Sequence, residues 1–559
     1  MTRPWLRRYP AKVAWDQAIP PGTLLAMLEE ACAAFAHRPA LDFLGRRLSY
    51  AQLRARVHAA AEGFRRLGAG PGTRVAICLP NSAAFVIAYF GAMTAGAAVT
   101  ALSPLHVEDD MAAQLRDSGA EILVCSDLDP LLPRALALLA REDTPVRHLA
   151  VAAFPKELPW LKGWAFRLLK RRQLATVPAG DARLHDFDAW AGLPAIAAPH
   201  PARPEEPAVL QYTGGTTGTP KAAVLTHGNL SANARQVMAW FTTSRPGGEV
   251  TLAVIPFFHV FAMTVAMNVG LFGGSCVVMQ PRFDWAMLKA ALRRTRPTVF
   301  PGVPTLFKAL LDRGATPALL KSVKACISGG APLPAQVKAD FEALAGCTLV
   351  EGYGLTESSP VAFCNPLEGE NRAGTIGVPL PGVVPSLRSL EDPAREVPAG
   401  ERGELCLKGP NVMAGYWNRP AETAAAFTPD GFLRTGDVGV MDEDGYVTLV
   451  DRIKDLILVS GFNVYPRTVE EAIWRHPEVA AVTVVGMPDA SKGEVPAAFV
   501  QPREGSGLTA EALRDFLQGK LSPIEMPRHI ELRAELPRTA VGKLSKKELR
   551  AELQERPRP

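Results

Sequence analysis

QYTGGTTGTPKAAVLTHGNL, residues 211–230, contains a loop with three glycines and four threonines that ends at Lys221. A short apolar run precedes the loop, and a helix capped near Asn229 is expected after it. Glycine lets backbone N–H groups approach anionic oxygens closely, threonine hydroxyls add donors, and the lysine adds a positive charge. This composition predicts a phosphate-binding loop, with a flexible polar turn as the alternative. The loop differs from a Walker A loop because a Thr-Pro pair separates Gly218 from Lys221.

On either side of this loop, short β-type runs alternate with segments of helical periodicity. Apolar positions recur at helical spacing over residues 49–69, and a Gly-Pro-Gly turn then leads into the β-type run 74–80. Asn81 stands where it would cap a further helix. Similar β-type runs occupy residues 120–126, 276–279 and 348–354. Because repeated strand–helix units are typical of parallel sheets with helices on both faces, the predicted fold class is α/β.

The length of 559 residues exceeds that of a usual single domain, so we expect at least two domains. The first is a large N-terminal domain of stacked β-sheets with flanking helices, residues 1–450. A hinge at residues 451–454 and a small mobile α+β domain at residues 455–559 are expected to follow. Within the first domain, the Pro- and Ala-rich stretch 191–207 is typical of an exposed connector.

The composition argues against several functional classes. The formal net charge is +5, with 61 basic and 56 acidic residues, so the chain lacks the positive excess of a nucleic-acid-binding protein. The eight cysteines form no C-x-x-C pair, which argues against zinc sites and against a disulfide framework. The N-terminus, MTRPWLRRYP, lacks the apolar core of a secretory signal. Together these features predict a cytoplasmic protein.

Two apolar stretches, residues 83–107 and 251–279, approach the length of a membrane span. A span usually needs about 20 uninterrupted apolar residues. Glycines and a proline interrupt the first stretch, and a proline, a histidine, an asparagine and glycines interrupt the second. Both stretches are therefore predicted to be buried α/β core.

Five further motifs follow the loop along the chain. They are EGYGLTES (351–358), GELCLKGPNVMAGYW (403–417), TGDVG (435–439), DRIKDLILVSGFNVYP (451–466) and PRTAVGKLSKKEL (537–549). In this order, the six motifs resemble the adenylate-forming superfamily, which includes acyl-CoA synthetases, luciferases and peptide-synthetase adenylation domains. The residues of these motifs are most similar to those of bacterial long-chain fatty acid CoA ligases. The resemblance implies that ATP activates a carboxylic acid as an acyl-adenylate, which is then transferred to coenzyme A.

The resemblance also implies a nucleotide site that is spread over several motifs. Its ATP and AMP contacts are Thr213, Gly214, Gly215, Thr216, Thr217, Gly218, Lys221, Gly329, Gly330, Gly352, Tyr353, Gly354, Thr356, Asp437 and Arg452. Tyr353 would offer its ring to adenine, although such a ring also suits core packing. Asp437 would accept both ribose hydroxyls. Arg452 would contact the ribose and a phosphate, with an ordinary surface ion pair as the alternative.

Catalytic roles are implied at three positions. Glu357 would hold Mg²⁺ on the ATP phosphates together with the hydroxyl of Thr216, or else be a solvated carboxylate. Lys543 would be a mobile cation that stabilises the negative charge formed during adenylation. Lys454 would be the pivot of a rotation that replaces Lys543 by the face of Ser460 and Gly461, to which coenzyme A is assigned.

The acyl site is assigned to the segment PFFHVFAMTVAMNVG, residues 256–270, where His259 and Phe261 are the candidate contacts. His259 would position the carboxylate or gate the acyl tunnel, and it would equally suit a satisfied core histidine. Aromatic residues and methionine also fill ordinary cores, so the chain length of the acid does not follow from this segment.

Residues 159–173, PWLKGWAFRLLKRRQ, combine two tryptophans with several lysines and arginines. This pattern is typical of a helix on a membrane surface. The alternative is a solvated helix that docks on the core through its apolar stripe. Peripheral contact with the inner face of the membrane is therefore one hypothesis for this cytoplasmic chain.

As a whole, the sequence predicts a fatty acid–CoA ligase for long or medium chains that uses ATP, Mg²⁺ and coenzyme A, with no nucleic-acid partner. Two other enzymes share the first half-reaction. One is a dicarboxylate (pimeloyl-type) or aryl acid CoA ligase, and the other loads an acyl group onto a carrier protein. A silent acyl or nucleotide sensor is the alternative outside enzymes, and Lys543, Glu357 and Asp437 count against it. A homodimer is compatible with the sequence.

Overall fold

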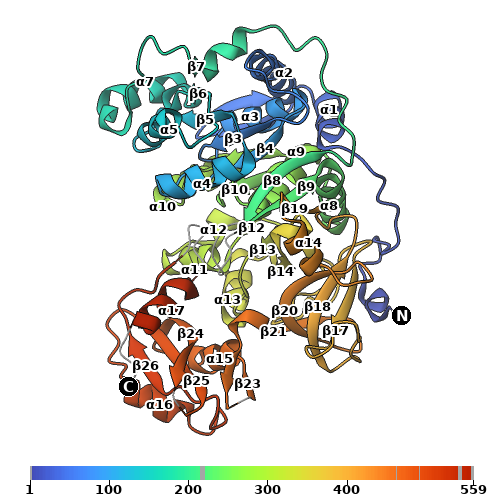
Figure 1. Ribbon diagram of the computed structural model, residues 1–559, viewed down its shortest axis with the longest axis vertical. Coiled ribbons are helices and arrows are strands. Elements are labelled where there is room, and N and C mark those ends of the chain that lie inside the picture. Colours follow the sequence, from blue (N-terminus) through green and yellow to red (C-terminus); the bar gives the residue numbers. More distant parts are fainter. Residues whose placement is uncertain (1–2, 214–220, 461, 490, 539–543, 556–559) are drawn as a thin grey trace. The chain divides into compact units, whose positions relative to one another are not determined.

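The computed structural model describes residues 3–213, 221–460, 462–489, 491–538 and 544–555. The chain forms two compact units (Figure 1). The first comprises Met1–Val384 and Lys408–Ala426, and the second comprises Pro385–Leu407 and Phe427–Pro559. The chain therefore leaves the first unit, returns to it for residues 408–426, and leaves again. The predicted hinge at residues 451–454 lies within the second unit, and its role stays a prediction.

An eight-stranded sheet forms one part of the first unit, in the order β19-β9-β8-β4-β3-β5-β6-β7. Its strands are β3 (Arg74–Cys78), β4 (Ala98–Ala101), β5 (Ile122–Ser126), β6 (His148–Ala152), β7 (Leu184–Asp186), β8 (Pro207–Thr213), β9 (Lys221–Thr226) and β19 (Gly415–Tyr416). The strands β8, β4, β3, β5, β6 and β7 are parallel to their neighbours in this order. Strand β9 is antiparallel to both β8 and β19. The predicted phosphate loop therefore connects two adjacent antiparallel strands.

A nine-stranded sheet forms the other part, in the order β16-β15-β14-β13-β12-β10-β11-β1-β2. Its strands are β1 (Pro39–Phe43), β2 (Arg46–Ser49), β10 (Val250–Ala253), β11 (Cys276–Met279), β12 (Val299–Gly302), β13 (Ala325–Ser328), β14 (Thr348–Gly354), β15 (Val361–Cys364) and β16 (Val378–Pro379). The six strands from β14 to β1 are parallel, and antiparallel pairs extend the sheet at both ends. Strands β3, β5, β11 and β14 confirm the four β-type runs predicted from the sequence.

Helices cover both sheets. Those of the first unit are α1 (Leu24–Ala34), α2 (Tyr50–Arg66), α3 (Ala83–Thr94), α4 (Glu108–Ser118), α5 (Leu131–Ala140), α6 (Phe154–Glu157), α7 (Trp160–Leu169), α8 (His227–Trp240), α9 (Val269–Phe272), α10 (Trp285–Thr295), α11 (Pro304–Asp312), α12 (Pro317–Leu320), α13 (Ala335–Ala345) and α14 (Pro420–Ala426). Helix α3 contacts strands of both sheets, whereas α2 contacts β1 and β2 of the nine-stranded sheet. Helices α4 and α5 share a core with the eight-stranded sheet, and α10, α11 and α13 share one with the nine-stranded sheet. This arrangement confirms the α/β class with stacked sheets.

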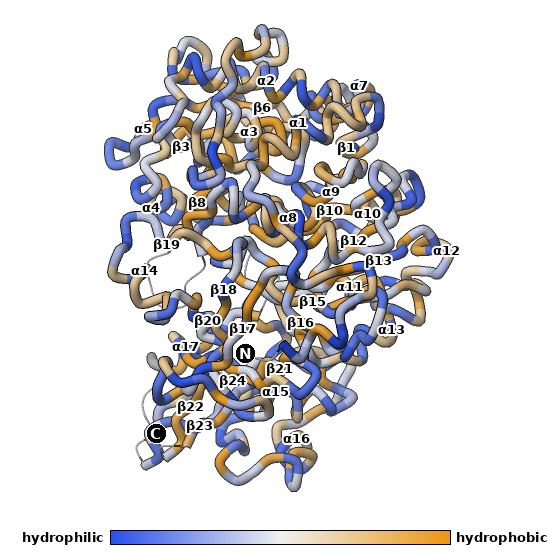
Figure 2. The backbone as a smooth tube through the Cα atoms, turned by 90° about the vertical axis from the view of Figure 1, so that its right-hand side faces the viewer, coloured by the Kyte–Doolittle hydropathy of each residue, from blue (hydrophilic) through white to orange (hydrophobic). Residues whose placement is uncertain are grey.

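Helix α3 is apolar all round because it is enclosed on every side. Each residue from Ala84 to Thr94 is buried. A Cβ at Gly91 would lie 2.9 Å from the Cβ of Ala60, so the close approach of α2 and α3 requires glycine there. The apolar stretch 83–107 thus forms buried core up to Ser103, as predicted, whereas Leu105 and Val107 at its end are exposed. Figure 2 shows hydrophobic segments gathered around α3 and β10. Among the described residues, no helix is long and apolar enough to cross a membrane.

The second unit contains two smaller sheets. One has the order β17-β18-β20-β21, with β17 (Val384–Arg388), β18 (Arg402–Lys408), β20 (Leu433–Met441) and β21 (Val447–Arg452). The other has five strands: β22 (Ile457–Val459), β23 (Phe462–Val464), β24 (Val479–Asp489), β25 (Gly493–Pro502) and β26 (His529–Leu532). Its helices are α15 (Pro466–Trp474), α16 (Ala510–Leu517) and α17 (Lys546–Glu555). Mixed helices and strands after residue 455 confirm the α+β character expected there.

The side chain of Asn81 joins the end of β3 to the segment that follows β10. Its amide nitrogen donates to the Ile255 carbonyl at 2.9 Å, and its oxygen accepts from the Phe257 N–H at 2.7 Å. The capping role predicted for Asn81 is therefore wrong, because the neighbouring Ser82 caps α3 instead. Asn81 fixes the beginning of the predicted acyl segment, residues 256–270, to the eight-stranded sheet.

We expect the substitution Asn81→Ala to destabilise the first unit by about 2–3 kcal/mol, because it leaves a buried carbonyl and a buried N–H group without partners. Asn81 is only 3% exposed, so water does not replace the lost amide. Urea unfolding followed by tryptophan fluorescence measures the change. Gln336→Ala on α13, where the side chain bonds only the exposed Asp340, is the control and should cost less than about 0.5 kcal/mol. Equal stability of the two variants would contradict the bridging role.

Candidate functional site

The hairpin of β8 and β9 holds both ends of the predicted phosphate loop. Thr213 and Lys221 are register partners, and the Thr213 hydroxyl donates to the Lys221 carbonyl at 3.3 Å. Gly214, Gly215, Thr216, Thr217 and Gly218 lie outside the described residues, so their phosphate contacts stay predictions. Helix α8 begins directly after Thr226, which forms a capping box with Asn229 and confirms the predicted cap.

Lys221, Tyr416 and Glu357 form a polar cluster beside this hairpin. Tyr416 lies on β19, and the Lys221 ammonium is 5.5 Å from the centre of its ring. The Tyr416 hydroxyl donates to Glu357 Oε1 at 2.7 Å. Desolvation and the nearby Glu357 carboxylate raise the pKa of Tyr416, so the hydroxyl stays protonated and continues to donate. The cluster therefore places a cation, a fixed donor and a carboxylate where the loop ends.

Glu357 is presented by the short 3-10 turn Thr356–Ser358 that follows β14. Its backbone carbonyl accepts from the Met413 N–H at 2.8 Å. Asn411, which is fully buried, donates to the Ser358 carbonyl at 2.9 Å. These bonds hold the turn against residues 411–416, and so they set the position of Glu357 relative to Tyr416.

Tyr353, the residue predicted to stack on adenine, lies between two glycines at the end of β14. A Cβ at Gly352 would lie 2.9 Å from a side chain of β13, and one at Gly354 would lie 1.7 Å from the Pro360 carbonyl oxygen. No larger residue fits at Gly354. The half-buried Tyr353 ring packs edge-on against Phe363, with ring centres 6.3 Å apart. A packing contact is thus present, and the contact with adenine stays a prediction.

Phe261, a candidate acyl residue, lies against Gly329, a candidate nucleotide residue. A Cβ at Gly329 would be 2.9 Å from the Phe261 ring, so the ring covers the glycine backbone. Nδ1 of His259 accepts from the Phe261 N–H at 3.3 Å. The Phe258 carbonyl accepts from the Gln211 amide at 3.0 Å, which ties this segment to β8. The structure therefore brings the predicted acyl and nucleotide segments into contact, and their binding roles stay predictions.

After Phe261 the chain forms the π-helical segment η4 (Ala262–Asn268), every residue of which is buried. Such turns are rare and frequently lie at functional sites. The Thr264 hydroxyl donates to the Ser359 carbonyl at 2.8 Å. This bond fixes η4 to the turn that presents Glu357.

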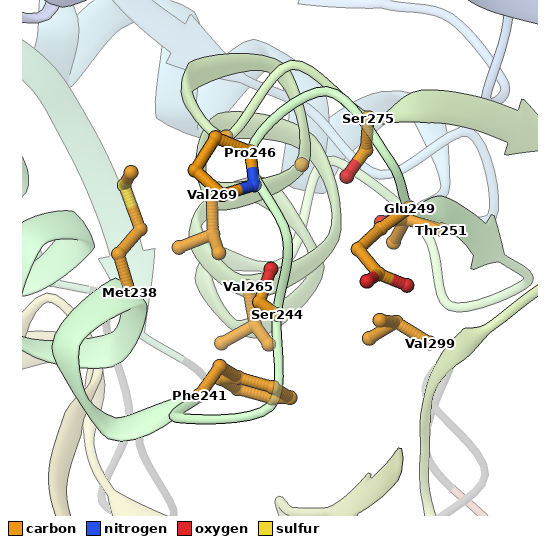
Figure 3. A pocket seen from close by; sticks show the side chains of 12 residues that line it. Met238, Phe241, Ser244, Pro246, Glu249, Thr251, Val265, Val269, Ser275 and Val299 are labelled. Carbon is orange, nitrogen blue, oxygen red and sulfur yellow. The ribbon is translucent and has the colours of Figure 1, made fainter. Parts of the chain in front are cut away.

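A cavity of about 120 Å³ lies along η4 and α9 (Figure 3). Residues on its walls include Met238, Phe241, Glu249, Thr251, Val265 and Val269. One carboxylate oxygen of the buried Glu249 accepts from the Arg245 N–H, and no described residue bonds the other. Neither His259 nor Phe261 is among the lining residues. Pockets for drug-sized ligands measure about 300–1,000 Å³, so this cavity is too small for a whole long acyl chain.

In the second unit, Asp437 on β20 and Arg452 on β21 are register partners. Nε of Arg452 lies 2.8 Å from Oδ1 of Asp437, whose side chain is 5% exposed against 48% for the arginine. The two residues that were predicted as separate nucleotide contacts therefore form one ion pair. Their contacts with ribose and phosphate stay predictions.

Lys454 follows in the 3-10 turn η6 (Ile453–Asp455). Desolvation of its ammonium group and the positive charge of Arg452 lower the pKa of Lys454. Ser460 lies after β22 with a φ of +51°, a conformation that costs energy for a residue other than glycine and is enriched at functional sites. Gly461 and Lys543 lie outside the described residues. The pivot, coenzyme A and mobile-lysine roles stay predictions.

Two residues that connect the site received no role from the sequence. Tyr416 stands in the motif 403–417, and the Gly-Tyr-Trp ending of that motif is the sequence feature that points to it. Asp117 on α4 has no motif at all. Its carboxylate accepts from the Tyr212 hydroxyl at 2.8 Å and pairs with Arg419 at 2.8 Å, so it joins β8 to the segment that carries Tyr416.

Two family models match the chain. The model described as AMP-binding enzyme matches residues 28–417, and the model described as AMP-binding enzyme C-terminal domain matches residues 468–543. The first match contains the phosphate loop, Glu357 and Tyr416, and the second lies in the second unit.

Curated relatives match over nearly their whole length. A Long-chain-fatty-acid–CoA ligase from Bacillus subtilis (strain 168) is 37% identical over 98% of this chain and 97% of its own. One from Escherichia coli O6:H1 is 37% identical over 99% of this chain and 98% of its own. A Feruloyl-CoA synthase from Amycolatopsis sp is 34% identical over 92% of this chain and 96% of its own.

Among solved structures, the ATP-bound MatB from Rhodopseudomonas palustris has a TM-score of 0.84 at 29% identity, over 96% of this chain and 99% of its own. The fold, both family models and the full-length relatives agree. The chain therefore belongs to the AMP-binding enzyme family, in its acyl-CoA synthetase branch, as an AMP-forming acid–CoA ligase.

Proposed function

We propose that this enzyme converts a long-chain or medium-chain fatty acid, ATP and coenzyme A into acyl-CoA, AMP and pyrophosphate through an acyl-adenylate. The observation that carries the proposal is the 37% identity, over nearly the full chain, to a Long-chain-fatty-acid–CoA ligase. The buried segment η4, which begins beside the contact of Phe261 with Gly329, supports an apolar acid.

In the first half-reaction, a carboxylate oxygen of the acid attacks the α-phosphorus of ATP and pyrophosphate leaves. Negative charge on the phosphoryl oxygens must be stabilised as the two anions meet. We assign phosphate binding to the loop and to Lys221, because the lysine lies with Tyr416 and Glu357 at the end of that loop. Lys543 is the proposed mobile cation at the reacting phosphate.

Glu357, with Thr216, is the proposed ligand set for Mg²⁺. The carboxylate fits a hard cation, since Oε1 is held by Tyr416 and no described residue hydrogen-bonds the second oxygen. When bound, the ion would neutralise phosphate charge. The Tyr416 hydrogen bond then orients the carboxylate without occupying all of its acceptor sites.

In the second half-reaction, the thiol sulfur of coenzyme A attacks the acyl carbonyl carbon, the thiol proton is lost, and AMP leaves. A rotation about Lys454 is proposed to replace Lys543 by the face of Ser460 and Gly461. Asp437 is proposed to accept the ribose hydroxyls, with Arg452 beside it on the ribose and phosphate. The ion pair between these two side chains would hold the Asp437 carboxylate in place for that task.

A second candidate is an aryl acid CoA ligase, which the 34% identity to a Feruloyl-CoA synthase favours. Dicarboxylate activation and the loading of a carrier protein would use the same first half-reaction. The proposal also includes a cytoplasmic location, a homodimer, and peripheral contact with the inner membrane face through residues 159–173.

The decisive experiment is pyrophosphate release with a panel of acids, with and without coenzyme A, followed by mass detection of the thioester. Long-chain and medium-chain fatty acids should give the highest kcat/KM and a CoA thioester. Preference for ferulate or benzoate over every fatty acid would replace the proposal by the aryl alternative. Pyrophosphate release without any thioester would favour a carrier protein as the acceptor.

We expect Lys543→Ala to lower the rate of adenylation by about 10² or more, because it removes a charge that stabilises the transition state. Thioester formation from supplied acyl-adenylate should remain close to that of the unchanged enzyme. Single-turnover assays of each half-reaction measure the two rates separately. An equal loss in both would contradict the assignment of Lys543 to the first half-reaction.

We expect Tyr416→Phe to raise the KM for ATP by about tenfold, because a hydrogen bond to a charged group contributes about 1.5–3 kcal/mol. Steady-state kinetics at several Mg²⁺ concentrations measure this change and show whether added Mg²⁺ restores binding. Tyr9→Phe is the matched control, since its hydroxyl donates to the Pro379 carbonyl and not to the cluster. An unchanged KM in the Tyr416 variant would show that its hydroxyl does not orient Glu357 for nucleotide binding.

A further inference from the structure

Helix α7 exposes five large apolar side chains. They are Trp160, Leu161, Trp164, Leu168 and Leu169, with exposed fractions between 56% and 84%. In Figure 1 the helix, coloured teal, lies at the periphery of the first unit. Single exposed apolar residues are ordinary, whereas a contiguous group of this size marks an interaction surface.

Four of the five exposed apolar side chains lie on one side of the helix, whereas Leu169 lies outside their arc. At 3.6 residues per turn, Trp160, Leu161, Trp164 and Leu168 fall within an arc of about 100°. Gly163, the one fully buried residue of α7, lies outside that arc. The alternative of a helix docked on the core by its apolar stripe does not hold for these four side chains, which face solvent, whereas Gly163 faces the protein.

Gly163 and Phe166 attach the helix to the protein. A Cβ at Gly163 would lie 2.2 Å from the Pro155 carbonyl oxygen, so α7 rests on the backbone of α6. The Phe166 ring contacts Phe154 at 5.2 Å between centres, and Phe154 contacts Phe43 of β1 at 5.9 Å. This series of rings leads from α7 into the nine-stranded sheet, so the apolar side is held outward by a firm attachment.

Basic side chains accompany the apolar side. Lys162, Arg167, Lys170, Arg171 and Arg172 are all exposed, and residues 159–173 contain no acidic residue. None of the five forms a salt bridge with a described residue, and Lys162 instead donates to the Leu44 carbonyl at 2.9 Å. The helix and the turn after it therefore present an excess of positive charge next to exposed tryptophans.

We infer that α7 docks on a bilayer that contains anionic lipids, with Trp160, Trp164 and Leu168 inserted among the headgroups and the basic side chains on the lipid phosphates. Tryptophan and leucine beside lysine and arginine are the composition that favours this interface. This inference rests on the membrane contact proposed for this enzyme, and it states which side chains of α7 make that contact. It does not depend on which acid the enzyme activates.

A bilayer fits this surface better than a second copy of the chain does. In a two-fold dimer through α7, the five positive side chains would face the same five on the partner copy, which is unfavourable. An anionic lipid surface supplies the opposite charge over a broad area, and its acyl region accepts the indole and leucine groups.

Flotation of the full chain with vesicles tests the inference. We expect the chain to bind vesicles of phosphatidylcholine with phosphatidylglycerol at low salt, and to bind pure phosphatidylcholine weakly. High salt should release most of the bound protein, because the electrostatic part is screened. Absence of binding to the anionic vesicles at low salt overturns the inference.

Two sets of variants locate the surface. Trp160→Ser with Trp164→Ser and Leu168→Ser should lower the vesicle partition coefficient at least tenfold, and the single variant Phe283→Ser, which alters an exposed ring beyond α7, should leave it unchanged. Lys170→Gln with Arg171→Gln should lower it by about fivefold per charge. Arg282→Gln with Arg293→Gln is the charge-matched control. An effect of the controls equal to that of the α7 variants contradicts the assignment.

Two further measurements separate the outcomes. The activity of the α7 variants on a water-soluble acid, measured without vesicles, should equal that of the unsubstituted enzyme. Vesicle binding is measured without substrate, so its result stands even if the proposed enzyme function fails. Sedimentation velocity measures the oligomeric state of the same variants. The inference is overturned if the α7 substitutions dissociate an oligomer and the unsubstituted protein does not bind anionic vesicles. In that case a second copy of the chain covers α7.

Discussion

The buried amide of Asn81 supplies the interaction on which the candidate site most depends. It bonds both the Ile255 carbonyl and the Phe257 N–H, and so it joins the end of β3 in one sheet to the chain that leaves β10 in the other. The same segment continues to His259, Phe261 and η4. Stacking two sheets only creates proximity, whereas these two directional bonds fix the position of the acyl segment relative to the phosphate hairpin.

Local sequence predicts the strands because buried parallel strands are continuous apolar runs. It does not predict which sheet they join: β3 and β5 belong to one sheet and β11 and β14 to the other, although all four runs look alike. Asn81 shows the same limit. Asn81 and Ser82 are both suitable helix-capping residues. Because Asn81 bonds the Ile255 carbonyl, 174 residues away, Ser82 caps α3.

The sequence motifs identify the candidate site residues, but only the fold shows which of these residues contact one another. Glu357 and Lys221 stand in motifs, but the residue between them, Tyr416, is 59 positions from Glu357 and reaches it only because β19 joins β9. In the second unit, register alone makes Asp437 and Arg452 partners. A ribose that binds there must share the aspartate with a guanidinium, which no linear motif reveals.

The return of residues 408–426 to the first unit has a consequence for biosynthesis. Strand β19 completes the eight-stranded sheet from a position almost two hundred residues after β9, and residues 385–407 of the other unit come in between. At about 5–20 residues per second, Tyr416 leaves the ribosome roughly 10–40 s after Lys221. During that interval the edge of β9 has no partner, so nascent chains would expose an open strand edge that the finished enzyme covers.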